Sequence, residues 1–333
     1  MENSPYLVFI IGAGASKDFG QNMPVGPELA DRIERILNEE FGRGGTPDGP
    51  ISNALALSAG GFGANHVIAA NRIRRAIHTK DSIDDLLDEW KDIPEMLQVG
   101  KVAIAHIIQQ AECNSNLATN GDTANGFLET VGRFRDSWLG RVVRHVRPGT
   151  SRRRLADALN DMAFVIFNYD RCVEHMLVGE LLCNTEMDTG QAQSFVANMA
   201  IVHPYGSLGA QGGPNAIAPF GRSSNYLERM ALDIRTYTEE AHDLSNLNRL
   251  KAILEGARTT VFLGFSYHPK NLDLLLQHGL NLQSDIYGAC KHPCPRVDDA
   301  RRKLSPGVGS PSNLTDMGCD QFISSYQRAL FGI

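Results

Sequence analysis

The residues best suited to chemistry stand in four short motifs, and the first is a glycine turn. An apolar run from Tyr6 to Ile11 leads directly into Gly12-Ala13-Gly14-Ala15-Ser16. Glycines spaced in this way let a backbone approach a phosphate and leave amide N–H groups free to donate hydrogen bonds. The Ser16 hydroxyl could add a further donor to a phosphate or ribose. The turn therefore suggests a phosphate-bearing ligand, although Gly-x-Gly without a third glycine also fits an ordinary tight turn.

Two further motifs each end an apolar run with polar side chains. "FNYD" places Asn168 and Asp170 two residues apart, and "HPYG" does the same for His203 and Tyr205. On an extended chain this spacing points both side chains of a pair to one face. An amide beside a carboxylate suits a ribose and a carboxamide, and it also fits an Asx turn that ends a strand. His203 is the candidate general base, with Tyr205 as the alternative, although a histidine beside a core strand is often structural.

The fourth motif, "GFSYHPKN", follows another apolar run. Gly264 and Ser266 could contact a ribose or a phosphate. Pro269 ends the extended segment, and we expect His268 to be a loop residue rather than a catalyst.

The elements that must position these motifs form an α/β pattern. Short apolar runs predict buried strands, and helical patterns such as those at 27–41 and 245–257 separate several of them. The predicted strands lie within Tyr6–Ile11, Met162–Asp170, Asn198–Gly206, Arg258–Ser266 and Ser284–Cys290. This pattern predicts a Rossmann-like, doubly wound, mostly parallel sheet. Ligands bind at the carboxyl ends of the strands in such sheets, so the four motifs should converge on one crevice.

The segment between the first and second strands has a different composition. It begins with glycine-rich stretches and continues with helical patterns, including "DSIDDLLDEW" and "VGKVAIAHIIQQAE". In the first of these, Ile83, Leu86, Leu87 and Trp90 form one apolar stripe. We therefore predict a core formed by residues 1–45 and 150–333, and a helical insertion subdomain at 46–149 that provides an oligomerisation or partner surface.

Composition is typical of a globular protein that can bury a sizeable core. The chain has 333 residues, of which 42% are hydrophobic, and a net charge of −6. This charge gives no overall sign of nucleic-acid binding, and the basic cluster Ser151–Asp157 fits a solvated helix start. No apolar run reaches the roughly 18 residues of a membrane span, and no signal peptide is evident. We expect a cytoplasmic protein with free thiols. Cys290, His292 and Cys294 have no second ligand pair, which argues against a metal site.

Taken together and in this order, the motifs resemble the sirtuin-like NAD-consuming fold. The resemblance covers the first strand and turn, and then about residues 160–290. The family's GAG-x-S turn is matched by Gly12, Ala13, Gly14 and Ser16, its N-x-D by Asn168 and Asp170, and its G-x-S by Gly264 and Ser266. The resemblance implies NAD as the ligand, bound by these residues together with Tyr205. It also implies that Asn168 and Asp170 contact the nicotinamide riboside part.

The departures from the family are informative. Sirtuin deacylases carry two zinc-binding cysteine pairs and a G-I-P-D-F-R segment, and this chain has neither. The helical insertion instead looks like that of the sirtuin-like domains of bacterial antiphage systems. Those domains hydrolyse NAD, often with a partner such as a HerA-family ATPase or an Argonaute-like protein. The family's catalytic histidine usually directly precedes glycine, whereas Tyr205 precedes Gly206 here and His203 lies two positions earlier.

The resemblance implies an NAD glycohydrolase that releases nicotinamide and ADP-ribose and depletes NAD in abortive-infection defence. In this hypothesis His203 accepts a proton, Asn168 orients the ribose or water, and no metal takes part. Because unregulated hydrolysis would be toxic, we expect activation by a homo-oligomer or a protein partner, with nucleic acid bound only through that partner and no membrane. The alternatives are an NAD or ADP-ribose sensor without turnover and a protein deacylase. A dehydrogenase is disfavoured because Glu34 lies within a predicted helix.

Overall fold

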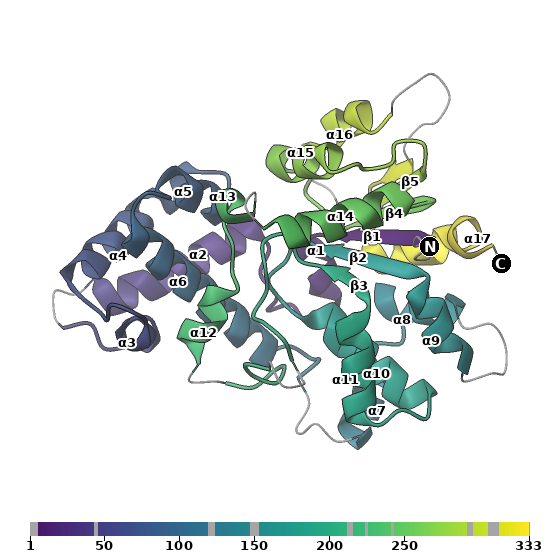
Figure 1. Cartoon of the computed structure of the whole chain (residues 1–333), viewed down its shortest axis with the longest axis horizontal. Helices are drawn as coiled ribbons and strands as arrows, with labels where there is room; N and C mark the ends of the chain where they lie inside the picture. Colours follow the sequence, from purple (N-terminus) through teal and green to yellow (C-terminus); the bar gives the residue numbers. More distant parts are fainter. Residues whose placement is uncertain are drawn as a thin grey trace.

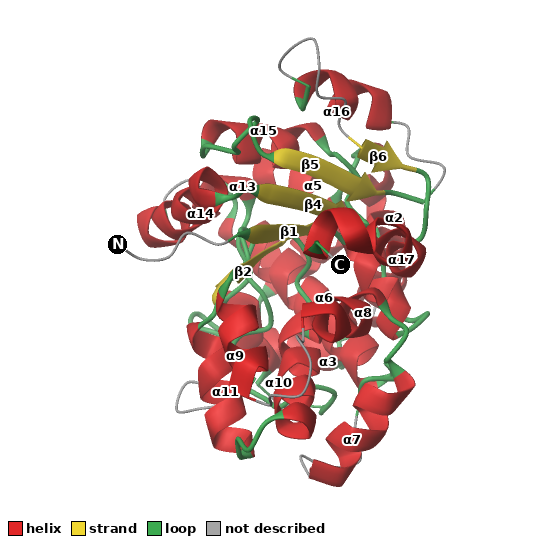
Figure 2. Ribbon diagram, turned by 90° about the vertical axis from the view of Figure 1, so that its right-hand side faces the viewer, coloured by secondary structure: helices red, strands yellow, loops and turns green. Residues whose placement is uncertain are grey.

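The computed structural model describes residues 6–42, 46–118, 124–146, 153–211, 216–223, 226–240, 243–291, 296–305 and 313–332. At its centre is a six-stranded sheet with the order β3-β2-β1-β4-β5-β6, and all five strand pairs are parallel. The strands, shown in yellow in Figure 2, are β1 (Leu7–Ile11), β2 (Met162–Ile166), β3 (Ala200–Val202), β4 (Thr259–Leu263), β5 (Asp285–Ala289) and β6 (Asn313–Thr315). The predicted Rossmann-like, doubly wound α/β fold is confirmed.

This strand order places the glycine turn where ligands usually bind in doubly wound sheets. From β1 the chain moves outward through β2 and β3 on one side, and it returns to β4 before moving outward again through β5 and β6. The order therefore reverses between β1 and β4. In doubly wound sheets the crevice at such a reversal, outside the carboxyl ends of the strands, is the usual place for a ligand. The turn that begins at Gly12 lies at this point.

The central strand is buried on both faces, as its continuous apolar run predicts. Val8 and Ile10 of β1 belong to one hydrophobic core, and Leu7, Phe9 and Ile11 belong to a second core on the opposite face. Phe9 stacks on Phe164 of β2, with ring centroids 5.4 Å apart. Since side chains alternate along a strand, only an all-apolar sequence can fill two cores at once.

Helices cover both faces of the sheet and extend into a separate helical lobe (Figure 1). The helices before β2 are α1 (Ala13–Ser16), η1 (Lys17–Phe19), α2 (Gly26–Phe41), α3 (Pro50–Leu57), α4 (Ala64–Ala76), η2 (Ile77–Thr79), α5 (Ile83–Glu89), α6 (Pro94–Cys113), α7 (Ala124–Arg133), α8 (Trp138–Val146) and α9 (Arg153–Asn160). Those after β2 are α10 (Cys172–Asn184), α11 (Thr189–Asn198), α12 (Leu227–Leu232), α13 (Tyr237–Glu240), α14 (Leu244–Gly256), α15 (Pro269–Gln277), α16 (Val297–Lys303) and α17 (Cys319–Phe331).

The helices of the segment predicted as an insertion go to two places. Helices α3, α4 and α6 pack with α2 and α12 in the lobe to the left of the sheet in Figure 1. Helix α7 packs on α10, and α8 packs on α17, so both lie against the sheet core rather than in the lobe. The basic cluster at 151–157 lies partly outside the described residues, and α9 begins at Arg153 within it.

Candidate functional site

The glycine turn lies in direct contact with the turn that follows β4. Gly12 N donates to Leu263 O at 2.9 Å, and Gly14 N donates to Gly264 O at 3.1 Å. A Cβ on Gly12 would lie 2.5 Å from Gly264 O, and one on Gly264, whose φ is +58°, would lie 2.1 Å from Ala15 N. Backbone contact between the two turns therefore accounts for these glycines. The expectation that the glycine amides are free for a phosphate is wrong for Gly12 and Gly14.

Helix α8 also holds this turn in place. The indole Nε1 of the fully buried Trp138 donates to Ala15 O at 3.0 Å, and Trp138 N donates to the Asp18 carboxylate at 3.1 Å. Burial raises the pKa of Asp18 to about 6, although the hydrogen bond from Trp138 opposes this. The turn is thus held by side-chain contacts as well as by its neighbouring strand.

The structure brings together three of the predicted site residues from the tips of β1 and β2. Asn168 Nδ2 donates to Ser16 Oγ at 2.8 Å, and Ser16 Oγ donates to Asp170 Oδ2 at 2.9 Å. The other oxygen of Asp170 accepts from Cys172 N at 3.2 Å, at the start of α10. Ser16, Asn168 and Asp170 are 3%, 6% and 5% exposed, so they form a buried polar group whose members hydrogen-bond to one another.

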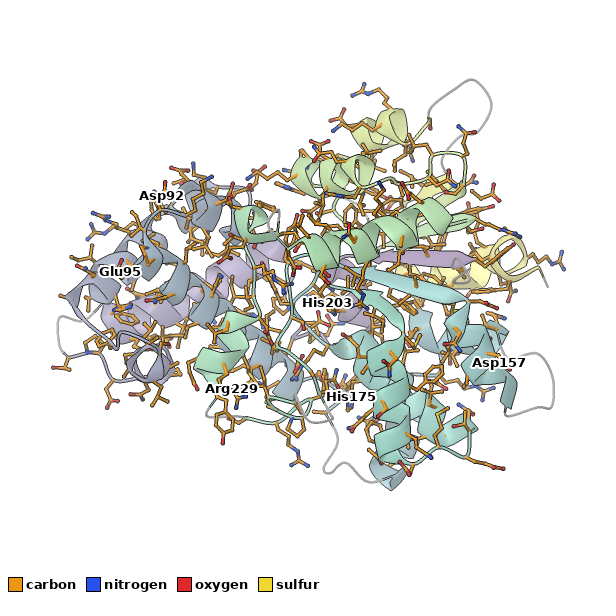
Figure 3. All side chains as sticks on the ribbon, in the orientation of Figure 1. Asp92, Glu95, Asp157, His175, His203 and Arg229 are labelled. Atoms are coloured by element: carbon orange, nitrogen blue, oxygen red, sulfur yellow. The ribbon has the colours of Figure 1, made fainter. Side chains whose placement is uncertain are left out.

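His203 follows β3 and joins this group through the backbone of β2. Its Nδ1 lies 2.9 Å from Asn168 O, and its Nε2 lies 2.8 Å from Glu174 Oε1 (Figure 3 labels His203). A carbonyl and a carboxylate can only accept hydrogen bonds, so both ring nitrogens carry protons when Glu174 is ionised. His203 then has no free lone pair. It can accept a proton from a substrate only after one of these two bonds breaks.

The charges of this pair stabilise each other. Burial opposes the protonated form of His203, but the adjacent Glu174 carboxylate outweighs burial and raises the pKa of His203. Burial likewise opposes ionisation of Glu174, but His203 outweighs it and lowers the pKa of that carboxyl. The favoured state is therefore an imidazolium paired with a carboxylate.

A cavity of about 480 Å³ opens beside this pair, at the edge of the sheet formed by β3. Its wall combines Glu174 and His203 with Arg171, Arg235, Asn246 and Arg249. Glu174 Oε2 is buried and has no hydrogen-bond partner in the part of the chain that the structure describes. The residues of the glycine turn, Asn168 and Asp170 do not line this cavity.

A buried ion pair connects the cavity with the helical lobe. Arg171 and Glu112, on α6, are each 1% exposed, and Arg171 Nη2 lies 2.6 Å from Glu112 Oε2. Arg171 also donates to Ala218 O at 2.8 Å, and its backbone N donates to Glu112 Oε1 at 2.9 Å. These bonds hold Arg171, which directly follows Asp170, to α6 and to the segment that contains Ala218.

The remaining predicted site residues lie elsewhere. Tyr205 is buried in the core beside Phe167, and its hydroxyl donates to Asn271 Oδ1 at 2.9 Å, so it does not line the cavity. Gly264 makes the contact with the glycine turn described above, and Ser266 is exposed. His268 lies 3.3 Å from Asp85 of α5 and is 9% exposed.

The sequence motifs missed Glu174, Arg171 and Glu112. Glu174 stands four residues after Asp170, in the first turn of α10, and no motif marks it. Its position relative to Asp170 could have drawn attention, because the first helical turn after a strand tip lies at the carboxyl edge of the sheet. Glu112 could not have been found in this way, since only the fold brings α6 to the tip of β2.

The described residues contain no group of three or more His, Cys, Asp or Glu side chains placed to hold a metal ion. His292 and Cys294, which the sequence places near Cys290, lie outside the described residues. Within the described parts of the chain, no helix is both long and apolar enough to span a bilayer.

The chain was compared with protein-family models, with curated proteins and with solved structures, and no significant match was found. The function of the chain is therefore inferred from its site geometry and its sequence motifs.

Proposed function

We propose that this chain binds NAD at the carboxyl edge of the sheet and hydrolyses its nicotinamide–ribose bond to nicotinamide and ADP-ribose. The observation that carries the proposal is the group formed by Ser16, Asn168 and Asp170, beside the turn at which the strand order reverses. A hydroxyl, an amide and a carboxylate at this place suit a ribose and a carboxamide. Because all three are buried, NAD reaches them only when the strand tips separate locally.

The proposed chemistry asks little of the protein beyond binding and orientation. Nicotinamide is cationic in NAD and leaves as a neutral base, so the reaction passes through a state that resembles an oxocarbenium ion and needs no strong acid. Ala13 and Ser16 of the glycine turn, with Gly264 and Ser266, would contact the phosphates and the adenosine ribose, since the amides of Gly12 and Gly14 are already bonded to Leu263 O and Gly264 O. Asn168 would orient the reacting ribose, Asp170 would bind the carboxamide and His203 would complete the site, whereas the Tyr205 hydroxyl, bonded to Asn271, would take no part.

A second candidate function is an NAD or ADP-ribose sensor without turnover. The specific observation in its favour is that both ring nitrogens of His203 already have partners. Such a protein would bind the nucleotide in the same crevice and pass the signal to a partner. For either function we propose a cytoplasmic role in antiphage defence, with activity controlled by homo-oligomerisation or by a partner such as a HerA-family ATPase.

The test follows nicotinamide release from NAD by chromatography and NAD binding by the shift in melting temperature. We expect release by the wild type and at least a 100-fold loss in Asn168→Ala, with Tyr205→Phe nearly as active as the wild type. His78→Ala, with a half-exposed side chain on the helical lobe, is the control. Binding without release, both by the chain alone and with the proposed HerA-family partner added, would favour the sensor. If the wild type shows no binding and no release, both candidate functions are refuted.

Oligomerisation is tested separately by size-exclusion chromatography with light scattering. A monomer at micromolar concentration would contradict the expected homo-oligomer.

A further inference from the structure

The two carboxylate oxygens of Glu174 differ in their hydrogen bonding. Glu174 Oε1 accepts the hydrogen bond of His203 Nε2 at 2.8 Å, whereas Oε2 is buried and has no partner within the described residues. A buried polar atom without a partner costs free energy, on the order of 1–3 kcal/mol. Glu174 also lines the cavity of about 480 Å³ beside the strand tips. Because this oxygen is closed to solvent, a water that donates to it arrives only when the strand tips separate locally, as the binding of NAD already requires.

We propose that Glu174, and not His203, is the base that takes the proton from water in the hydrolysis of NAD, and that His203 is a positioning residue that orients Glu174. This inference rests on the proposed function.

The hydrogen bonds decide between the two residues. A general base needs a free lone pair within reach of the proton that it removes. Both nitrogens of His203 are committed, to Asn168 O and to Glu174 Oε1. Of the two side chains, only Glu174 has an atom that can accept a further hydrogen bond, namely Oε2. His203 in turn is bonded to the backbone of Asn168, so it fixes the distance between Glu174 and the tip of β2.

The proposed step is balanced in atoms and charge. The oxygen of a water molecule forms a bond to C1′ of the ribose, and one proton of that water passes to Glu174 Oε2. The bond between C1′ and the pyridinium nitrogen breaks, and its electron pair stays on nitrogen, so neutral nicotinamide leaves. ADP-ribose retains the new hydroxyl, and Glu174 returns its proton to solvent. Carboxylates activate water in the same way in many glycoside hydrolases.

The charges around Glu174 set the expected pH dependence. The charged and titratable groups that line the cavity with it are His203 from the β3 tip, Arg171 at the start of α10, Asp233 and Arg235 after α12, and Asp243 and Arg249 at α14. His203 and Arg171 are cations that lower the pKa of Glu174 against the effect of burial. Glu174 should therefore be ionised at neutral pH, and activity should fall as acid protonates it. Without the His203 cation, this acidic limb should move to higher pH.

The experiment compares Glu174→Gln, His203→Gln and the control Glu186→Gln, which changes an exposed side chain beyond α10. We expect Glu174→Gln to lose at least 100-fold in nicotinamide release, the usual size of a general-base effect, while NAD still raises its melting temperature. Gln can accept the bond from His203, so folding should be kept. His203→Gln should lose about tenfold and shift the acidic limb upward, and Glu186→Gln should match the wild type.

The contrary outcomes are distinct. If Glu174→Gln keeps more than a tenth of the wild-type rate while His203→Gln is inactive, His203 is the base and the inference fails, but the proposed function stands. If the wild type binds NAD and releases no nicotinamide, the hydrolase function fails and the role of Glu174 with it. Nitrogen NMR of the His203 ring gives a test that needs no turnover. A ring with a single proton at pH 7 would overturn the inference.

Discussion

The tips of β1 and β4 differ from the tip of β3 in how their polar groups are used. At β1 and β4 two backbone turns touch, and beside them Ser16 hydrogen-bonds to Asn168 and Asp170 of the β2 tip. At β3 a cavity opens, and Glu174 keeps a buried oxygen without a partner among the described residues. A conspicuous glycine motif can thus be explained by close packing. Glu174, the residue whose carboxylate oxygen is not used, lies outside the four sequence motifs.

The strongest test acts on the buried ion pair that joins Arg171, at the β2 tip, to Glu112 of α6 in the helical lobe. Arg171→Met leaves the buried Glu112 carboxylate without its cation, and such a loss costs about 3–5 kcal/mol of unfolding free energy. Urea denaturation measures it. The double variant Arg171→Met with Glu112→Leu should regain most of the loss, because apolar groups can replace a buried ion pair. A single variant as stable as the wild type would show that the pair does not hold the β2 tip to α6.

The packed tip is tested at Gly264. Its positive φ and the 2.1 Å approach of an added Cβ to Ala15 N make any side chain unfavourable there. We expect Gly264→Ala to lose about 3 kcal/mol of unfolding free energy, from backbone strain and overpacking together. Gly132→Ala is the control, since Gly132 lies exposed on α7 with nothing near its Cβ position, and it should gain up to about 1 kcal/mol. Equal stability of the two variants would contradict the close contact.

A smaller effect is expected at Ser16, the hydroxyl between Asn168 and Asp170. Ser16→Ala removes an acceptor and a donor in a buried place, which costs about 1–3 kcal/mol. Ser266→Ala, at the exposed serine of the other matched motif, should change stability by less than about 0.5 kcal/mol. Thermal and urea unfolding of the two variants make the comparison. If neither substitution changes the unfolding free energy, the hydrogen bonds among Ser16, Asn168 and Asp170 do not stabilise the fold.

The tip of β3, with the His203–Glu174 pair, should have the smallest effect, a contribution to stability that depends on pH. The pKa of His203 is raised above 6.5, so its contribution is present below pH 6.5 and is lost as pH rises through the folded-state value. The pKa of Glu174 is lowered below 4.5, so its contribution is present above pH 4.5 and is lost as pH falls through its folded-state value. The stability difference between wild type and Glu174→Gln should therefore be greatest between these limits. Urea midpoints from pH 4 to 9 test this, and a flat difference would argue against the ion pair.

Much of the sheet could be predicted because its strands are short apolar runs. Five of the six strands lie within the predicted ranges, and the exception is Asn313–Thr315, three residues with a single apolar side chain. Helix α5 lies within the helical pattern DSIDDLLDEW, and it begins after Ser82, whose side chain accepts a hydrogen bond from Asp85 N. Helix α10 has apolar residues on nearly all sides, since it is almost wholly buried, so it shows no amphipathic stripe. The start of helix α11 could have been predicted from the sequence, because Asp188 and Gln191 form a capping box.

The site was predictable only in part, for a geometric reason. Strand ends are local features, so the meeting of Ser16, Asn168 and Asp170 follows from parallel strands alone. The direction of a side chain after a strand end is not local. His203 and Tyr205 are two residues apart, yet one contacts Glu174 and the other contacts Asn271 of α15, because the chain turns between them, with Gly206 N donating to His203 O at 3.1 Å.

The contact between Trp138 and Ala15 provides a built-in optical reporter. The chain has two tryptophans, and Trp138 is fully buried with its indole N–H bonded to the backbone of the glycine turn. In a Trp90→Phe background, the intrinsic fluorescence would come from Trp138 alone. A ligand that separates the strand tips would wet or polarise this indole and shift its emission. The arrival of NAD at the turn can then be followed in real time, without a label and without waiting for product.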